Sequence, residues 1–302
     1  MSRYLWKRVL LSGAQVIVLS FLAFVLLSVA PGHFHSEQQL DPQRSAAAVD
    51  TWMREQGLAG PWPRRYAAWM QSCLAGTCGV SLAYGLPVSS LVAARFPLTA
   101  AIVIPAWIFG WLAGLSLAWL AAARPRLGGA IEPWLWTTSL LPEIVLGSLL
   151  LWLGVALGWP ISGAGLPVSI LALALASVVF LHARRALADA AEARFVQIAR
   201  LRGVSPSIVW WRYVLPAAAN PLVSLLAPTL VGATGSALAV EVLTGWPGLG
   251  PLFLEAFRTR DYPVVQAVLV LLGSVLTFAA LAADVLLYRL DTRIRLTPEP
   301  GA

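Results

Sequence analysis

Long apolar stretches separated by shorter polar ones dominate this chain. Six such runs are visible, at residues 9–30, 97–123, 134–157, 166–181, 214–240 and 263–288. A helix needs roughly 20 apolar residues to cross a bilayer, because in hydrocarbon every backbone polar group must be satisfied within the segment. The pattern predicts an all-α, polytopic membrane protein with six transmembrane helices. The fourth run is the shortest, and it suits a helix near the membrane normal or one extended by its flanks.

Composition agrees with a membrane protein. Of the 302 residues, 59% are hydrophobic and 12% are charged, whereas a typical soluble domain carries about 25% charged residues. The net charge of +7 would suggest nucleic acid in a soluble protein. Since no soluble basic domain is present, we expect no nucleic-acid partner. The first run exceeds the apolar core of a signal peptide, about 7–15 residues, so we interpret it as a retained span.

The distribution of Lys and Arg predicts the orientation. If the N-terminus is cytoplasmic, 14 of the 21 Lys and Arg residues lie inside and 7 lie outside. The short loops then obey the positive-inside rule, and the long segment 31–95 counts little. Both ends are therefore expected in the cytoplasm, with segment 31–95 on the outer side.

This outer segment is polar and aromatic. Residues Arg65 to Met70 and their neighbours are typical of an amphipathic helix on the membrane, with Tyr66 and Trp69 at the headgroup level. Cys73 and Cys78 face the oxidising side, where either a disulfide or two free thiols is compatible with the spacing. His33 and His35 have no tetrahedral Cys/His spacing to these cysteines, so we expect no metal site.

No catalytic constellation is visible in the sequence. There is no Walker-type phosphate loop, zinc-ligand helix or nucleophile elbow. We therefore expect neither an enzyme nor a cofactor or ATP site on this chain, so energy for transport must come from other subunits.

The connection between the fourth and fifth runs, residues 182–221, is too long for a tight turn. It predicts a helix, a break, and a second helix. Gly203 can adopt the left-handed conformation that ends a helix, Ser205 can cap the next one, and Pro206 fits its first turn. The result is a helix-turn-helix that projects into the cytoplasm.

Two interpretations of this connection are possible. A basic loop could be held by anionic membrane lipid. However, Arg200 and Arg202 alternate with the apolar or small residues Ala199, Leu201 and Val204. This alternation favours a helix end inserted into a groove of another protein.

Motifs at this connection resemble a known family. They are Ala190, Ala191 and Glu192, then Ala199, Arg200, Arg202, Gly203 and Ser205, and finally Leu215-Pro216. The run 199–205 is similar to the cytoplasmic coupling loop of dipeptide/oligopeptide-type, also nickel-type, permease subunits of binding-protein-dependent ABC importers. The glutamate follows the alanines here, at Glu192, and so departs from the usual EAA order.

The resemblance covers nearly the whole chain. Towards the N-terminus it rests on Ala30-Pro31-Gly32, Gly57-Leu58, Arg65-Tyr66, Trp69 and Gly79-Val80-Ser81, with His33-Phe34 and Thr77-Cys78 as departures. Towards the C-terminus it rests on Glu241, Trp246 to Gly250, Asp261-Tyr262-Pro263, Asp284 and Asp291 to Arg295. The order and spacing of these motifs along one chain carry the match.

The resemblance implies a fold and a set of partners. The fold is that of a type I ABC importer permease, with a five-helix domain at 96–290 that contains a coupling loop at 184–215. The flank and first span, 1–30, pack outside it, and 291–302 form a cytoplasmic tail. The partners implied are a second homologous permease, as a heterodimer, two ATPase subunits that carry ATP and Mg, and an external solute-binding protein. The cargo implied is a di- or oligopeptide, with a nickel complex or another small solute as alternatives, and the location is the bacterial inner membrane.

Several carboxylates within or beside the spans need their own interpretation. Glu143 lies inside the third run, where a carboxylate is costly enough to suggest a function, and it could line the translocation path. Glu241 could position an outer gate or the binding protein, or be a solvated helix end. Trp246 and Asp261 fall in the resembling C-terminal pattern and join this path-or-gate set.

Asp284 and Arg289 predict a structural ion pair at the inner end of the last span. A secondary transporter or channel with Glu143 and Asp284 as ion sites is an alternative, but it predicts two related halves and no internal repeat is found. A membrane electron carrier would need axial histidines inside spans, and His182, like the other two histidines, lies outside or at a span end.

Overall fold

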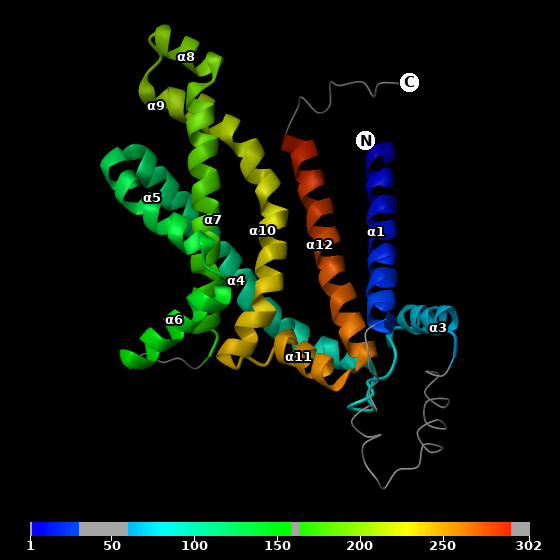
Figure 1. Cartoon of the computed structure of the whole chain (residues 1–302). Helices are drawn as coiled ribbons and strands as arrows, with labels where there is room; N and C mark the ends of the chain where they lie inside the picture. Colours follow the sequence, from blue (N-terminus) through cyan, green and yellow to red (C-terminus); the bar gives the residue numbers. More distant parts are fainter. Residues whose placement is uncertain (1, 30–59, 159–162, 291–302) are drawn as a thin grey trace.

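A computed structural model describes residues 2–29, 60–158 and 163–290 (Figure 1). The helices are α1 (Ser2–Val29), α3 (Trp62–Leu74), α4 (Val88–Ala123), α5 (Pro125–Leu140), α6 (Glu143–Ala156), α7 (Gly165–Glu192), α8 (Arg194–Leu201), α9 (Pro206–Val209), the π-helix η2 (Trp210–Val214), α10 (Leu215–Thr244), α11 (Leu249–Thr259) and α12 (Tyr262–Leu290). The all-α prediction is confirmed. The motifs at 30–32, 33–34, 57–58 and 291–295, His35, and the tail 291–302 lie outside the described residues.

The long helices stand side by side as a bundle. Helix α7 packs along α4 and α10, α10 packs along α12, and α12 packs along α1 at one side of the bundle (Figure 1). The tip formed by α8 and α9 lies at one end, here called the α8 end. Helices α3 and α11 lie at the opposite end, here called the α11 end.

Small residues let α4 and α7 approach closely. A Cβ at Gly110 would lie 2.8 Å from Leu175 Cδ2, and a Cβ at Gly114 would lie 2.7 Å from Val179 Cβ. Ala118, one turn further along α4, is fully buried. Without a hydrophobic force between helices in lipid, such close backbone packing is a main source of association.

The structure corrects the third predicted span. Within the described residues, five helices are long and apolar enough to cross a membrane, and the third run is instead a pair, Arg126–Leu140 and Glu143–Ala156, bent by 110°. Leu141 is extended, with ψ at 130°, because the following Pro142 disfavours helical geometry before it. The six spans predicted are therefore five unbroken spans and one broken one, and Glu143 begins a helix at the corner.

The fourth run forms a longer helix than its apolar core. Helix α7 has 28 residues, since its polar flank continues the helix to Glu192. Arg184 Nη2 in this flank lies 2.9 Å from Glu132 Oε2 of α5. The Arg185 guanidinium lies 5.4 Å from the centre of the Trp136 ring. These contacts hold α5 against the extended part of α7.

Helix α3 exists where the sequence predicted it, but its aromatic residues pack on α1. The Tyr66 hydroxyl lies 2.8 Å from Ser20 Oγ, and its ring contacts the rings of Phe21 and Phe24 at 5.6 and 5.3 Å. Burial lowers the pKa of Arg65, which lies over the Phe24 ring. Tyr66 therefore packs against α1, and its expected place at the headgroup level stays a prediction.

Asp284 pairs with a residue of the first helix. Arg8 Nη1 lies 3.2 Å from Asp284 Oδ2, which ties α1 to α12 at the α8 end. Sequence reasoning chose Arg289 as the partner, and the side chain of Arg289 lies outside the described part of the chain. The spacing rule that suggested Arg289 considers only residues one turn apart on the same helix, so it could not predict an ion pair between two helices.

Candidate coupling tip and translocation cavity

Gly203 closes the short helix α8 with the geometry that the sequence predicted. Its φ is +76°. The Gly203 N–H donates to Arg200 O at 3.0 Å, and the Val204 N–H donates to Ala199 O at 3.2 Å. This pair of bonds is the Schellman pattern, in which a left-handed residue satisfies the last carbonyls of a helix. Space is open around Gly203, so only backbone strain disfavours a side chain there.

Ser205 occupies the predicted position but not the predicted role. It precedes α9 with extended backbone angles, φ −59° and ψ 144°, and Pro206 fills the first turn. Its hydroxyl makes no capping bond to the backbone of α9 and lies 3.5 Å from Ser207 Oγ instead. Pro206 has no N–H and already supplies a suitable φ, so the helix begins without a side-chain cap.

Helix α8 has one face inside the protein and one face outside. Val196 and Ala199 are buried in a cluster with Val209 and Val214 of the following turns. On the other side, Phe195, Ile198 and Leu201 are 44%, 49% and 88% exposed. Three apolar side chains at a spacing of three residues therefore form an exposed stripe, which we call the tip stripe.

The remaining coupling candidates surround this stripe. Arg200 and Arg202 are exposed beside it, Ala190 is buried under α8, and Ala191 is half-buried. Glu192 is exposed at the last residue of α7. The structure thus brings all eight predicted residues to one end of the bundle, although Ala190 and Ala199 face inward.

At the α11 end, Glu241 is fully buried. Its Oε2 accepts a hydrogen bond from the Gly250 N–H at 2.6 Å, and its backbone carbonyl accepts from the Trp246 N–H at 2.9 Å. Gly250 lies so close to Leu238 O that a Cβ would collide with it. Glu241 therefore closes the turn between α10 and α11, and the solvated-end interpretation is wrong.

The same turn is bonded to α4. Trp246 Nε1 donates to Leu98 O at 2.9 Å, the Leu249 N–H donates to Thr99 Oγ1 at 2.9 Å, and Arg95 Nη1 donates to Pro247 O at 2.8 Å. These contacts fix α11 across the end of α4.

Asp261 links α12 to the segment before α4. Its Oδ2 accepts from Ser81 Oγ at 2.5 Å and from the Ala83 N–H at 3.1 Å, and the residue is fully buried. Beside it, the Tyr84 hydroxyl donates to Glu255 Oε2 at 2.7 Å, and this hydrogen bond raises the pKa of Tyr84. Glu241, Trp246 and Asp261 are thus internal anchors, and none of them lines the cavity described below.

Cys73 and Cys78 lie close to these anchors. Both are free thiols in the structure, and the disulfide that the spacing left open stays a prediction. Burial raises the pKa of Cys73, and a hydrogen bond with Cys78 adds to the effect. Cys78 itself has a φ of 55° in the turn that leads to α4.

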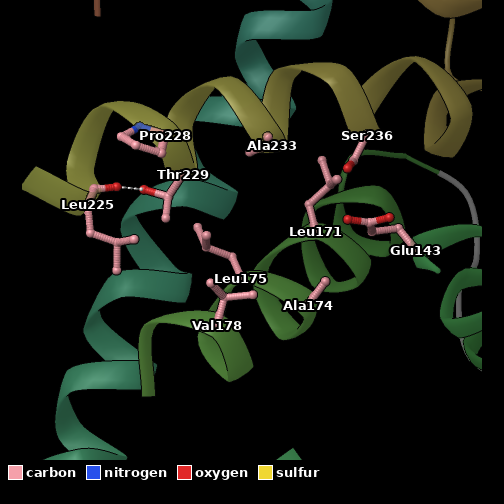
Figure 2. Close-up of a pocket in the computed structure, with 11 residues that line it drawn as sticks. Glu143, Leu171, Ala174, Leu175, Val178, Leu225, Pro228, Thr229, Ala233 and Ser236 are labelled. Atoms are coloured by element: carbon pink, nitrogen blue, oxygen red, sulfur yellow. Dashed lines mark hydrogen bonds between the residues drawn. The ribbon is translucent and has the colours of Figure 1, made fainter. Parts of the chain in front are cut away.

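One cavity of about 200 Å³ lies between α6, α7 and α10 (Figure 2). Its lining residues are Glu143 from α6, Leu171, Ala174, Leu175 and Val178 from α7, and Leu225, Pro228, Thr229, Gly232, Ala233 and Ser236 from α10. Glu143, the one path candidate that lines it, is also its single charged residue. Figure 2 shows Glu143 and Ser236 at one end and Leu225 and Val178 at the other.

Sequence reasoning missed a polar cluster behind this cavity. Thr229 Oγ1 accepts hydrogen bonds from Trp107 Nε1 and Trp111 Nε1, both at 3.1 Å, and donates to Leu225 O at 2.8 Å. Neither tryptophan was among the predicted site residues. The two tryptophans are four residues apart and so lie on one face of α4. Because buried indole N–H groups need an acceptor, this spacing could have indicated a shared polar partner.

Comparison with known proteins agrees with this architecture. Residues 108–296 match the family model described as binding-protein-dependent transport system inner membrane component. The chain is 28% identical to the oligopeptide transport system permease protein AppB of Bacillus subtilis (strain 168), with 97% of this chain and 99% of AppB covered. It is 29% identical to the glutathione transport system permease protein GsiC of Salmonella choleraesuis (strain SC-B67), with 98% and 99% covered.

Solved structures share the fold. The MetNI methionine ABC transporter in an inward-facing conformation aligns at a TM-score of 0.56 and 20% identity, over 68% of this chain and 98% of that one. An amino acid ABC transporter with histidines aligns at 0.57 and 18%, over 68% and 94%. Together, the family match and the shared fold define the class of this protein as a membrane subunit of an ABC importer. The chain belongs to the binding-protein-dependent transport system inner membrane component family and is a permease subunit of an ABC importer.

Proposed function

We propose that this permease subunit carries short peptides inward from an external binding protein. Separate ATPase subunits that carry ATP and Mg drive transport, a second homologous permease completes the path, and the tip stripe is the ATPase docking surface. The observation that carries this proposal is the tip stripe itself. Three large apolar side chains on a short helix outside the spans remain 44% to 88% exposed.

The packing of α8 supports a mechanical role for the tip. Val196 and Ala199 share one buried cluster with Phe180 of α7 and Ala218 of α10. If an ATPase displaces α8, α7 and α10 should therefore move with it, because the three helices are packed together. These two helices supply most of the cavity lining. Nucleotide-driven motion at the tip can thus change the shape of the cavity by alternating access.

Cargo and orientation follow from separate observations. Relatives over nearly the full length are named for oligopeptide and glutathione transport, so a short peptide is the cargo class favoured.

The excess of Lys and Arg on the α8 side supports a cytoplasmic α8 end in the bacterial inner membrane. Single cysteines at Ser207 and Gln71, with Cys73 and Cys78 replaced by serine, test this: a membrane-impermeant maleimide should label position 71 in intact cells and leave position 207 unlabelled.

Substituting Leu201 tests the docking proposal most directly. Leu201 is 88% exposed on the tip stripe, so Leu201→Asp should leave the fold intact. If the stripe docks an ATPase, the charge must be buried without a partner, and ATPase recovery with the affinity-purified permease should fall at least about tenfold. Leu74→Asp is the matched control, because Leu74 is 84% exposed on α3 at the opposite end.

The control variant should retain full ATPase recovery. Equal recovery with both variants would overturn the docking proposal. If ATPase recovery falls with both variants, the loss comes from a general effect on membrane assembly and not from the tip stripe.

A further inference from the structure

Glu143 has an unusual setting among the carboxylates of the spans. It begins α6 directly after the bend at Leu141-Pro142, and the Val145 N–H bonds back to Pro142 O at 2.9 Å. The bend therefore points the first residue of α6 towards α7 and α10. A carboxylate in the first turn of a helix interacts favourably with the free N–H groups there.

Four other carboxylates of the described helices have partners, Glu255 with Tyr84 among them, whereas Glu143 does not. Asp284 pairs with Arg8, Glu132 with Arg184, and the buried Glu241 carboxylate accepts from a backbone N–H. Within the described residues, the Glu143 carboxylate makes no hydrogen bond or ion pair. An unpaired carboxylate inside a membrane protein has a high free-energy cost. We therefore expect Glu143 to bind a group that does not belong to the described residues.

The cavity around Glu143 has a polar end and an apolar end. The Ser236 hydroxyl lies with Glu143 at one end (Figure 2) and makes no hydrogen bond within the described part of the chain. The hydroxyl of Thr229 is already used by Trp107, Trp111 and Leu225. The groups available to a ligand are thus one carboxylate and one hydroxyl, and the remainder of the wall is hydrocarbon.

The size of the cavity limits what fits. Its volume of about 200 Å³ is below the range of about 300–1,000 Å³ that is usual for pockets holding drug-sized ligands. One amino-acid residue fits where a whole oligopeptide does not. Leu171, Leu175 and Val178 would surround an aliphatic side chain, while the carboxylate would meet a cationic group.

We infer that Glu143 and Ser236 bind the terminal ammonium group of the cargo, with its first side chain against the apolar wall. The ammonium donates one hydrogen bond to the Glu143 carboxylate and one to Ser236 Oγ. This inference rests on the proposed peptide cargo and adds the part of the peptide that is recognised within the membrane. An arginine or lysine of the second permease is the competing partner for Glu143.

Equilibrium binding of radiolabelled L-leucinamide tests the site. This probe carries an ammonium and an isobutyl group but no carboxylate, and 4-methylpentanamide is the same molecule without the amine. The sample is the purified complex of both permeases and the ATPases, without the binding protein. Saturable binding should appear, and 4-methylpentanamide should not displace it.

Variants assign the binding to Glu143. Glu143→Gln should weaken leucinamide binding by about 10- to 100-fold, the usual effect of losing a hydrogen bond to a charged group. Glu143→Asp should retain part of the affinity. Ser148→Ala is the matched control, because Ser148 is an exposed residue of α6 that bonds to Ile144 O and lies outside the cavity lining.

Three results would overturn the inference: no saturable binding, equal displacement by 4-methylpentanamide, or unchanged affinity in Glu143→Gln. If Glu143 pairs with the second permease instead, Glu143→Gln should destabilise the permease pair and leave leucinamide binding absent in both proteins. The Leu201 experiment reads out ATPase assembly and not ligand binding. Failure of the leucinamide test with normal assembly would therefore remove the ammonium site alone.

Discussion

The two ends of the bundle use polar and apolar residues in opposite ways. At the α11 end, Glu241 and Asp261 are fully buried and hold the neighbouring backbone. At the α8 end, Leu201 and the arginines beside it are exposed. The α11 end bonds one carboxylate oxygen of each buried acid internally, whereas the α8 end places apolar side chains and arginines side by side on the surface. We expect the α11 end to act as a rigid closure and the α8 end to be the docking surface proposed for an ATPase.

The largest effect should come from adding a methyl group at the α11 end. Gly250→Ala would push a Cβ into Leu238 O and towards the Glu241 carboxylate, so the turn between α10 and α11 must shift. Overpacking of this kind costs about 1–3 kcal/mol or more. We expect a clear loss of monodisperse protein and a lower midpoint of thermal unfolding in detergent.

Gly235→Ala provides the matched control. It adds the same methyl group to α10, where no atom lies within 4 Å of the new Cβ. Its unfolding midpoint should not fall and should rise by up to about 2–4 °C, since alanine is favoured over glycine inside a helix by up to about 1 kcal/mol. Equal midpoints for both variants would mean that the α11 end is not the rigid closure described.

The next effect should appear at the α8 end and in assembly rather than stability. Gly203→Val forces a β-branched residue to the φ of +76°, which disfavours the closing turn of α8 and displaces the tip stripe. Uptake and ATPase co-purification should both fall, while membrane insertion is retained. Gly203→Asn tolerates the left-handed conformation and should keep most of the ATPase recovery.

A loop held by lipid would behave differently. Reversal of charge at Arg200 and Arg202 would then weaken binding to anionic vesicles, and both Gly203 variants would assemble normally.

A smaller effect concerns the reactivity of Cys73 at the closed α11 end. Its raised pKa leaves less thiolate at any pH below that value, and the thiolate is the reactive form. Alkylation by iodoacetamide should be slow at pH 8 and should still increase above pH 9, where an ordinary cysteine begins to level off. Replacing Cys78 with alanine removes one cause of the shift and should speed alkylation of Cys73. An unchanged rate in that variant would contradict the thiol contact.

The smallest effect is expected for the ion pair between Arg8 and Asp284. These side chains are 44% and 26% exposed, so solvent screens much of their attraction. Asp284→Asn should lower the unfolding free energy by less than about 1 kcal/mol. A double-mutant cycle with Arg8→Gln in chemical denaturation measures the coupling. A value above about 2 kcal/mol would indicate that α1 is as firmly anchored as the α11 end.

The sequence alone determined the helical class, the positions of the six apolar runs and the break at Gly203. These features depend on local chemistry: hydrocarbon requires satisfied backbones, and only glycine adopts positive φ without strain. The motifs by themselves also indicated the ABC importer family, because their order and spacing extend along nearly the whole chain. The residues proposed for the coupling tip were predicted from the same motifs.

Only the tertiary structure decided which side chains face one another. The bend after Leu141 turned Glu143 from a residue within a span into a cavity residue, and the hydrogen bond from the Gly250 N–H of α11 made Glu241 an internal anchor. Asp284 took its partner from α1, about 276 residues away along the chain. Such contacts depend on how helices cross in space, and a periodic pattern records which face is apolar but not which helix will cover it.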